Sequence, residues 1–247
     1  MLGQGYDGAA SMSGNFKGLQ SVIREKHSAA LYVHCSANSL NLALAHSSNI
    51  HYIRNCIGTV KSVDELQLFH DIETSSKALN LYGSITTSEF VTSLVTANTL
   101  FSLTLPLCKS LQLVTCDLSE TVTFVETVLN DVEDMRININ QTFKEIFEKA
   151  KNMLKLIDGE DQIKIPRLVG RQKNRNNVNV NSTEKYFHIA IAIPFYDDFI
   201  QQLKDRFSKH KTVLSSLSLL IPKMCHKAAI SATDFNLYSD YIDMDLL

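Results

Sequence analysis

The sequence contains no tryptophan, only four prolines and only five cysteines among 247 residues. The cysteines are odd in number and form no C-x-x-C pair, which argues against a disulfide framework and a finger-type zinc site and predicts a reducing compartment. The chain also shows no secretory pattern at its start and no unbroken run of about 18 apolar residues. We therefore expect a protein that is not secreted and has no membrane partner.

Neither sign of charge is in excess, because 24 Lys and Arg face 26 Asp and Glu, for a formal net charge of −2. The chain as a whole is therefore not attracted to a polyanion, and any contact with nucleic acid must come from a local basic patch. A hydrophobic content of 45% with 20% charged residues is typical of a globular protein. The length suits one large domain or two ordinary ones.

The chain opens on a glycine-rich stretch that surrounds one carboxylate, Asp7. Gly3, Gly5 and Gly8 match the dinucleotide fingerprint G-x-G-x-x-G, which needs a strand before it and an acidic residue at the end of a second strand. Only two residues precede Gly3, Glu25 lies in a sequence typical of a helix, and we expect no βαβ alternation to follow. Three interpretations remain: a phosphate cradle, which the sequence disfavours, a metal-binding carboxylate, and an aspartate that only shapes its turn.

The apolar periodicity predicts helices almost throughout. We expect a glycine turn leading into a helix at 15–26, a buried strand at 29–35 and a short helix at 36–45. Helical stripes follow in seven further ranges, with a break or kink at Pro106 and a last helix ended by Pro222: 51–72, 88–103, 107–113, 117–135, 143–154, 186–207 and 213–221. The sequence therefore predicts a mostly α protein with a small α/β part, and its stripes predict core rather than cofactor contacts.

The concentrated basic patch of the chain lies at 167–175, where four cations stand among asparagines: Arg167, Arg171, Lys173 and Arg175. Arg and Lys contact DNA phosphates without reading sequence. The alternative is a solvated linker over 158–184.

Several blocks resemble hAT-superfamily transposases, and most closely the domesticated zinc finger MYM-type protein 1-like group. Residues 5–14, GYDGAASMSG, resemble the family's G-x-x-D-G-A-x-N-M-S-G, and residues 34–42, HCSANSLNL, resemble its H-C-x-A-H-x-L-N-L. Residues 166–177, PRLVGRQKNRNN, and 186–198 resemble two further blocks in the family's order. Asn38 stands where the family has histidine, which puts any role of that histidine in metal or DNA contact in doubt.

The resemblance implies a partial RNase H-like core over 1–50, a helical insertion domain over 51–222 with the basic linker, and a tail over 223–247. It makes Asp7 the second of three carboxylates that hold two Mg²⁺ or Mn²⁺ ions, with Cys35 and Asn38 near the junction of core and insertion. From the residues alone, Cys35 is expected to be a buried small hydrophobe.

The family's first Asp and its Glu have no match in this sequence, so the resemblance implies a truncated, domesticated or decayed transposase without strand-cutting activity of its own. We expect it to bind no cofactor alone, to take no small-molecule substrate, and to bind DNA or another transposase-like subunit. The resemblance places it in the nucleus, with the cytoplasm as the alternative. An all-helical protein-interaction module with no nucleic-acid role is the second hypothesis.

Overall fold

The computed structural model describes residues 3–66, 74–112, 118–158, 163–166, 180, 182–218, 236, 238 and 240. The described residues form helices and one two-stranded parallel sheet, which confirms the mostly α fold class with a small α/β part. Contacts divide the chain into two units. Unit 1 comprises Met1–Ala43, Pro106–Leu129 and Gln201–Leu247, and unit 2 comprises Leu44–Leu105 and Asn130–Ile200. The division predicted at residues 50 and 222 stays a prediction.

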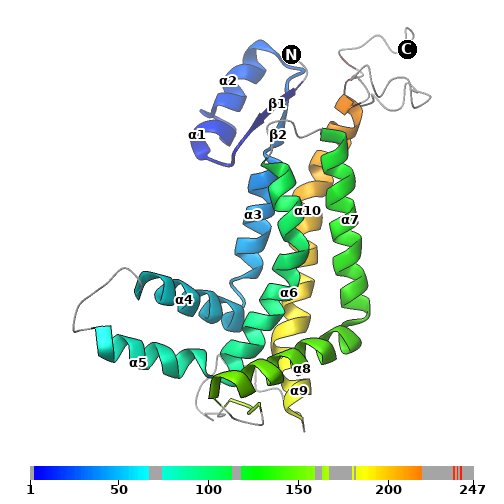
Figure 1. Ribbon diagram of the computed structural model, residues 1–247. Coiled ribbons are helices and arrows are strands. Elements are labelled where there is room, and N and C mark those ends of the chain that lie inside the picture. The colour runs from blue at the N-terminus through cyan, green and yellow to red at the C-terminus, as the bar shows by residue number, and fades with distance from the viewer. Residues whose placement is uncertain are drawn as a thin grey trace. The chain divides into compact units, whose positions relative to one another are not determined.

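The N-terminal part of unit 1 is a βαβ arrangement (Figure 1). It consists of β1 (Gly3–Tyr6), α1 (Ala10–Ser13), α2 (Leu19–Lys26) and β2 (Leu31–His34). The strands pair in parallel, with Gly3 opposite Leu31 and Tyr6 opposite His34, and a parallel pair needs such a crossover. The expectation that no βαβ alternation follows the glycines was therefore wrong. A four-residue strand with two glycines carries almost none of the β-branched and aromatic pattern that marks a strand.

Two buried glutamines hold this crossover together. The Nε2 of Gln4 in β1 donates to the carbonyl oxygens of Ala30 at 2.9 Å and Gln20 at 3.2 Å. The Nε2 of Gln20 in turn donates to the carbonyl of Ser13 and to Asn15 Oδ1. An unpaired buried carbonyl costs about 1–3 kcal/mol. The hydrogen bonds of these two side chains therefore stabilise the crossover in place of apolar packing.

Helices supply the rest of the described secondary structure of unit 1. Helix α3 (Ser36–Ser47) follows β2 directly, as expected, and buries Leu40 and Ala43 completely. Its other described helical residues belong to three long helices that also have residues in unit 2: α6 (Ser88–Leu111), α7 (Leu118–Ile137) and α10 (Ile193–Ser218). An ion pair between Lys211 of α10 and Glu126 of α7 links two of them within unit 1.

The described secondary-structure elements of unit 2 are all helices. Its own helices are α4 (His51–Leu66), α5 (Thr74–Ile85), α8 (Ile139–Asp158) and α9 (Thr183–Phe187), and Figure 1 shows α4 and α5 lying side by side. The stripe predicted at 143–154 is in the core, except that Met153 is 37% exposed. Its buried members are Phe143, Ile146, Phe147, Ala150 and Leu154.

A π-helical turn, η1 (His188–Ala192), joins α9 to α10. Fully or almost fully buried pairs of residues recur along this run at Tyr186–Phe187, Ile191–Ala192 and Phe195–Tyr196. The first step is five residues and the second is four. Because a π turn closes over i→i+5 and an α turn over i→i+4, η1 keeps all three pairs on one buried face.

Helix α6 begins at the predicted residue, Ser88, but extends beyond its predicted range to Leu111. The hydroxyl oxygen of Thr87, the residue before the helix, accepts from the backbone N–H of Phe90 at 3.2 Å. The helix continues through Pro106, so the predicted break is absent, and the alternative of a kink stays a prediction. Proline inside a helix costs about 3 kcal/mol, and the complete burial of Leu100 and Leu107 on either side of Pro106 offsets that cost.

By length and composition alone, α6 also satisfies the criteria for a membrane-spanning helix, with a mean hydropathy of 1.4 over an 18-residue window. Its sequence forms no unbroken apolar run, because Ser and Thr residues interrupt it. Half of that window is buried inside the protein, and the core helix of a globular protein passes the same test.

Candidate functional site

The carboxyl ends of β1 and β2 bring together the residues that the sequence marks most strongly. Asp7 directly follows β1, and His34 is the last residue of β2. In open α/β structures, ligands bind outside the carboxyl ends of parallel strands. This strand edge, with Asp7, Tyr32, His34 and Asn38, is the candidate site.

Asp7 lies at the tight turn that leaves β1. Its side chain is exposed, and its Oδ1 accepts from the backbone N–H of Ala9 at 3.2 Å, a bond typical of an aspartate that shapes a turn. Gly8 passes close to β2, because a Cβ at this position would lie 2.6 Å from Cε1 of His34. Glycine is therefore the residue that lets Asp7 approach the second strand.

His34 and Tyr32 form a hydrogen-bonded relay toward Asp7. Asn38 Nδ2 lies 2.9 Å from His34 Nε2, and His34 Nδ1 lies 3.2 Å from the Tyr32 hydroxyl. With the Asn38 amide as donor, Nε2 accepts and Nδ1–H donates to the hydroxyl oxygen. The hydroxyl can then donate to the carbonyl oxygen of Asp7 at 3.3 Å.

Both ring groups of the relay are held neutral. Burial is the main cause that lowers the pKa of His34, the charge of Arg206 lowers it further, and the charge of Asp7 opposes this. Burial likewise raises the pKa of Tyr32, a hydrogen bond with Ser13 lowers it, and the Asp7 carboxylate raises it. The site therefore presents one exposed carboxylate beside an uncharged relay.

These residues do not fit a two-metal centre by themselves. Mg²⁺ and Mn²⁺ take oxygen ligands, and two such ions need several carboxylates. At the described strand ends Asp7 is the one carboxylate, and both nitrogens of His34 already have hydrogen-bond partners. Across the part of the chain that the structure describes, no group of three or more His, Cys, Asp or Glu residues gathers.

The structure places the remaining predicted residues as follows. Asn38, on the first turn of α3, does lie at the strand edge with Asp7. Cys35 is exposed, and its predicted burial was wrong: its N–H donates to the carbonyl of Tyr6 at 2.8 Å and its carbonyl accepts from Ser39 N–H, so its backbone joins sheet to helix while its thiol faces outward. The basic residues Arg167, Arg171, Lys173 and Arg175 lie outside the described residues.

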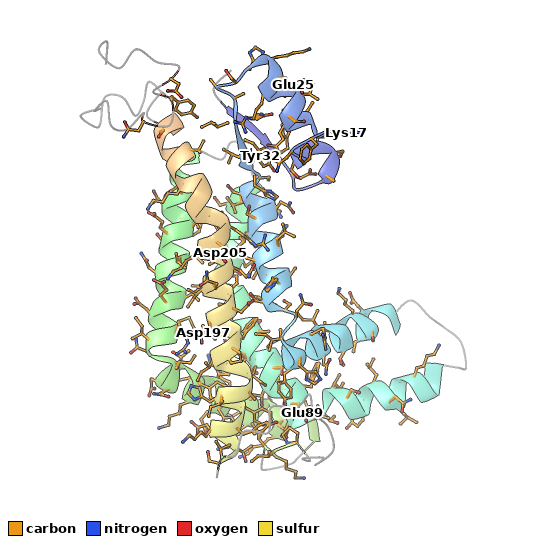
Figure 2. All side chains as sticks on the ribbon, turned by 180° about the vertical axis from the view of Figure 1, so that it is seen from behind. Lys17, Glu25, Tyr32, Glu89, Asp197 and Asp205 are labelled. Atoms are coloured by element: carbon orange, nitrogen blue, oxygen red, sulfur yellow. The ribbon has the colours of Figure 1, made fainter. Side chains whose placement is uncertain are left out.

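The geometry contradicts the dinucleotide-binding interpretation. Gly3 and Gly5 lie within β1, whereas the fingerprint places its glycines in the turn after the strand. Glu25 lies in α2 and not at the end of the second strand (Figure 2). The match of letters at Gly3, Gly5 and Gly8 is therefore not a match of structure.

Sequence reasoning overlooked Tyr32 and His34 as site residues. Their signal was their alternation in a predicted strand, since residues two apart in a strand share a face. The strand was predicted as an apolar, buried element, and this hid its polar face.

The chain is distantly similar to two curated proteins, both named 52 kDa repressor of the inhibitor of the protein kinase. It is 28% identical to the mouse protein over 147 residues, which cover 59% of this chain and 19% of that protein. It is 22% identical to the human protein over 284 aligned residues, which cover 88% of this chain and 37% of that protein. The chain thus spans well under half the length of the relatives it matches. No family model and no solved structure matches it.

Proposed function

We propose that this chain is part of a hAT transposase-derived protein and acts by binding rather than by cutting DNA. The observation that carries the proposal is the strand edge: Asp7 follows the first of two parallel strands, but its neighbours are Tyr32, His34 and Asn38 instead of further carboxylates. The distant similarity to a repressor supports a binding role. The same origin, within the zinc finger MYM-type protein 1-like group, supports a nuclear location.

In this proposal Asp7 is the second metal-binding carboxylate of an ancestral site, here embedded in a partial RNase H-like core. Mg²⁺ or Mn²⁺ would bind only where other carboxylates complete the site. DNA phosphates are contacted by the basic residues of the linker, Arg167, Arg171, Lys173 and Arg175, in a manner that does not depend on sequence.

Salt-dependent DNA binding tests this proposal. About four phosphate contacts give a log–log slope of affinity against salt near −3 to −4, measured by fluorescence anisotropy with a duplex oligonucleotide. Replacing all four linker cations by glutamine should remove most of that slope. The matched control replaces four cations of α8, Lys144, Lys149, Lys151 and Lys155, by glutamine and should keep it.

Two results would contradict the proposal. Binding of a transposase-like or other protein partner that is insensitive to salt, with no DNA binding at all, would favour the protein-interaction module. Nicking of supercoiled DNA in Mn²⁺ by the wild-type chain, lost in Asp7→Ala, would show that the chain cuts DNA by itself.

A further inference from the structure

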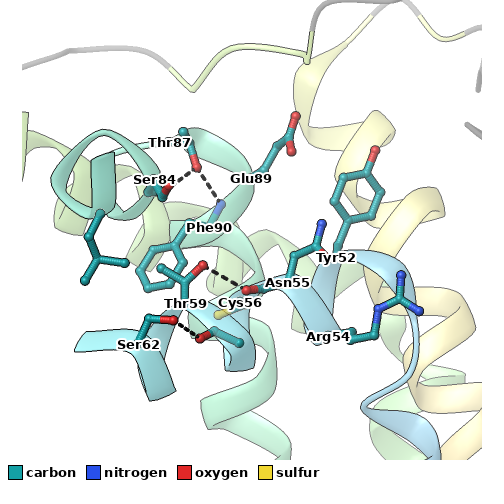
Figure 3. A pocket seen from close by; sticks show the side chains of 12 residues that line it. Tyr52, Arg54, Asn55, Cys56, Thr59, Ser62, Ser84, Thr87, Glu89 and Phe90 are labelled. Atoms are coloured by element: carbon teal, nitrogen blue, oxygen red, sulfur yellow. Dashed lines mark hydrogen bonds between the residues drawn. The ribbon is translucent and has the colours of Figure 1, made fainter. Parts of the chain in front are cut away.

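A pocket of about 610 Å³ lies within unit 2, between α4, α5 and the first turns of α6 (Figure 3). Its lining includes none of the strand-edge residues Asp7, Tyr32, His34 and Asn38. Its wall is rich in small polar side chains: Thr59 and Ser62 come from α4, Ser84 comes from α5, and Thr87 directly precedes α6.

The hydroxyl groups of this wall donate their hydrogens to backbone carbonyls. Thr59, Ser62 and Ser84 each donate to the carbonyl four residues earlier in their own helix, at 2.9, 3.1 and 3.0 Å. Thr87 donates to the carbonyl of Ser84 at 2.8 Å. Because a hydroxyl has one hydrogen and two acceptor lone pairs, these four groups can offer a ligand acceptors but no donors.

A carboxylate adds to this acceptor character. Glu89, on the first turn of α6, lines the pocket and forms no ion pair with any described residue. The Tyr52 hydroxyl already lies 2.7 Å from that of Tyr186, and the amide nitrogen of Asn55 contacts His51. Both side chains therefore have part of their donor capacity occupied.

Arg54 is the lining residue of opposite character. Its guanidinium carries donors only, and Figure 3 shows it on the other side of the pocket from Ser62, Ser84 and Thr87. A ligand that uses the hydroxyl wall and Glu89 would thus meet Arg54 as a repulsive charge if it is a cation, and as a partner if it is an anion. The effect of replacing Arg54 on binding therefore distinguishes a cationic ligand from an anionic one.

Gly58 opens the pocket. It lies in the middle of α4 on the lining, and a Cβ built on it meets no atom within 4 Å. Gly83 of α5 has the same open surroundings but does not line the pocket. The two helical glycines therefore differ in whether they line the pocket.

We propose that this pocket binds an arginine side chain from a basic segment of a partner protein. A guanidinium has five N–H donors and no acceptor, which complements a wall of lone pairs, and its charge pairs with the Glu89 carboxylate in a charge-assisted hydrogen bond. A phosphate group offers acceptors alone and fits the hydroxyl wall poorly. This proposal does not depend on the transposase origin.

The probe is a blocked tripeptide, acetyl-Gly-Arg-Gly-amide, titrated into the full chain while backbone amide shifts are followed by NMR. Shifts are expected at the lining residues of α4, α5 and early α6, and the citrulline analogue should bind more weakly. Glu89→Gln should weaken binding about tenfold, the loss expected for a hydrogen bond to a charged group. Arg54→Gln should strengthen it.

Gly58→Leu should abolish binding by filling the pocket, whereas the matched variant Gly83→Leu should bind like wild type. Leucine in place of a helical glycine favours the helix, so neither variant is expected to lose its fold. The proposal is overturned if the two glycine variants bind alike, if Arg54→Gln weakens binding, or if a phosphate-bearing or acidic peptide or an oligonucleotide binds the pocket more tightly than the arginine peptide.

Discussion

At the scale of single residues, the surroundings of His188 disfavour its protonated form. Its ring lies 5.3 Å from that of Phe143, and its Nε2 is buried without a hydrogen-bond partner among the described residues. Burial is the main cause that lowers its pKa, the charge of Arg136 lowers it further, and Glu184 opposes this. The native state therefore favours neutral His188.

This arrangement predicts how stability depends on pH. Because the folded-state pKa lies below the ordinary value of about 6.5, the unfolded chain binds more protons as the pH falls below that value. The free energy of unfolding should be fully present above about pH 6.5 and decline as the pH falls toward the folded-state pKa. His188→Phe should flatten this decline, measured as urea midpoints at about pH 7.5 and about pH 5.5.

The flattening should be partial, because burial lowers the pKa of His34 as well. A His188→Phe profile as steep as that of wild type would mean that His188 is protonated in the folded protein without cost.

At the scale of elements, the π turn η1 predicts an unusual tolerance to deletion. Removing Ala190 would shorten the step between the buried pairs at 186–187 and 191–192 from five residues to four, the spacing of a continuous α-helix. The deletion should therefore preserve the buried face and cost about 1–2 kcal/mol of stability, within the range of ordinary point substitutions.

Deletion of Gln201, an exposed residue of α10, is the matched control. It turns Leu203 by about 100° around the helix axis relative to Phe199, and both of these side chains are completely buried. This variant should fail to unfold cooperatively, as judged by circular dichroism in urea. Equal losses in the two deletions would mean that η1 does more than match spacings.

The elements with regular apolar periodicity could be predicted from the sequence, and those that depend on other forces could not. The stripe at 143–154 was correct because burial of one helix face repeats every three or four residues. Strand β1 was overlooked from its residues because two glycines and a buried Gln4 hold it through backbone pairing and side-chain amide bonds. The sequence predicted an interruption at Pro106 because proline is unfavourable inside a helix. Helix α6 nevertheless continues there, since Leu100 and Leu107 on either side are completely buried.

The candidate site was predictable in part. Its aspartate and Asn38 followed from the motif blocks, but the relay through Tyr32 and His34 depends on strand register, which no local pattern of the sequence reveals. The use of hydroxyl hydrogens in the pocket is likewise a property of the folded helices. The role of each Ser or Thr depends on a carbonyl three or four residues earlier being within reach.

At the scale of the whole molecule, the composition of unit 1 predicts how the chain folds. Unit 1 combines 1–43 with residues 106–129 and 201–247. Within 1–43 few side chains are buried, and three of these are the polar Gln4, Gln20 and Ser39. A two-stranded sheet with so small an apolar core is at best marginally stable by itself.

A fragment of residues 1–50 should therefore not fold alone. Without the stretches of α6, α7 and α10 that belong to unit 1, the completely buried Leu40 and Ala43 would lose the rest of their unit. We expect narrow amide dispersion by NMR and no cooperative thermal transition, whereas the full chain should show both dispersion and cooperativity. A fragment with dispersed resonances and a sharp transition would show that residues 1–50 are a self-sufficient domain, and that the long helices of unit 1 are dispensable for its folding.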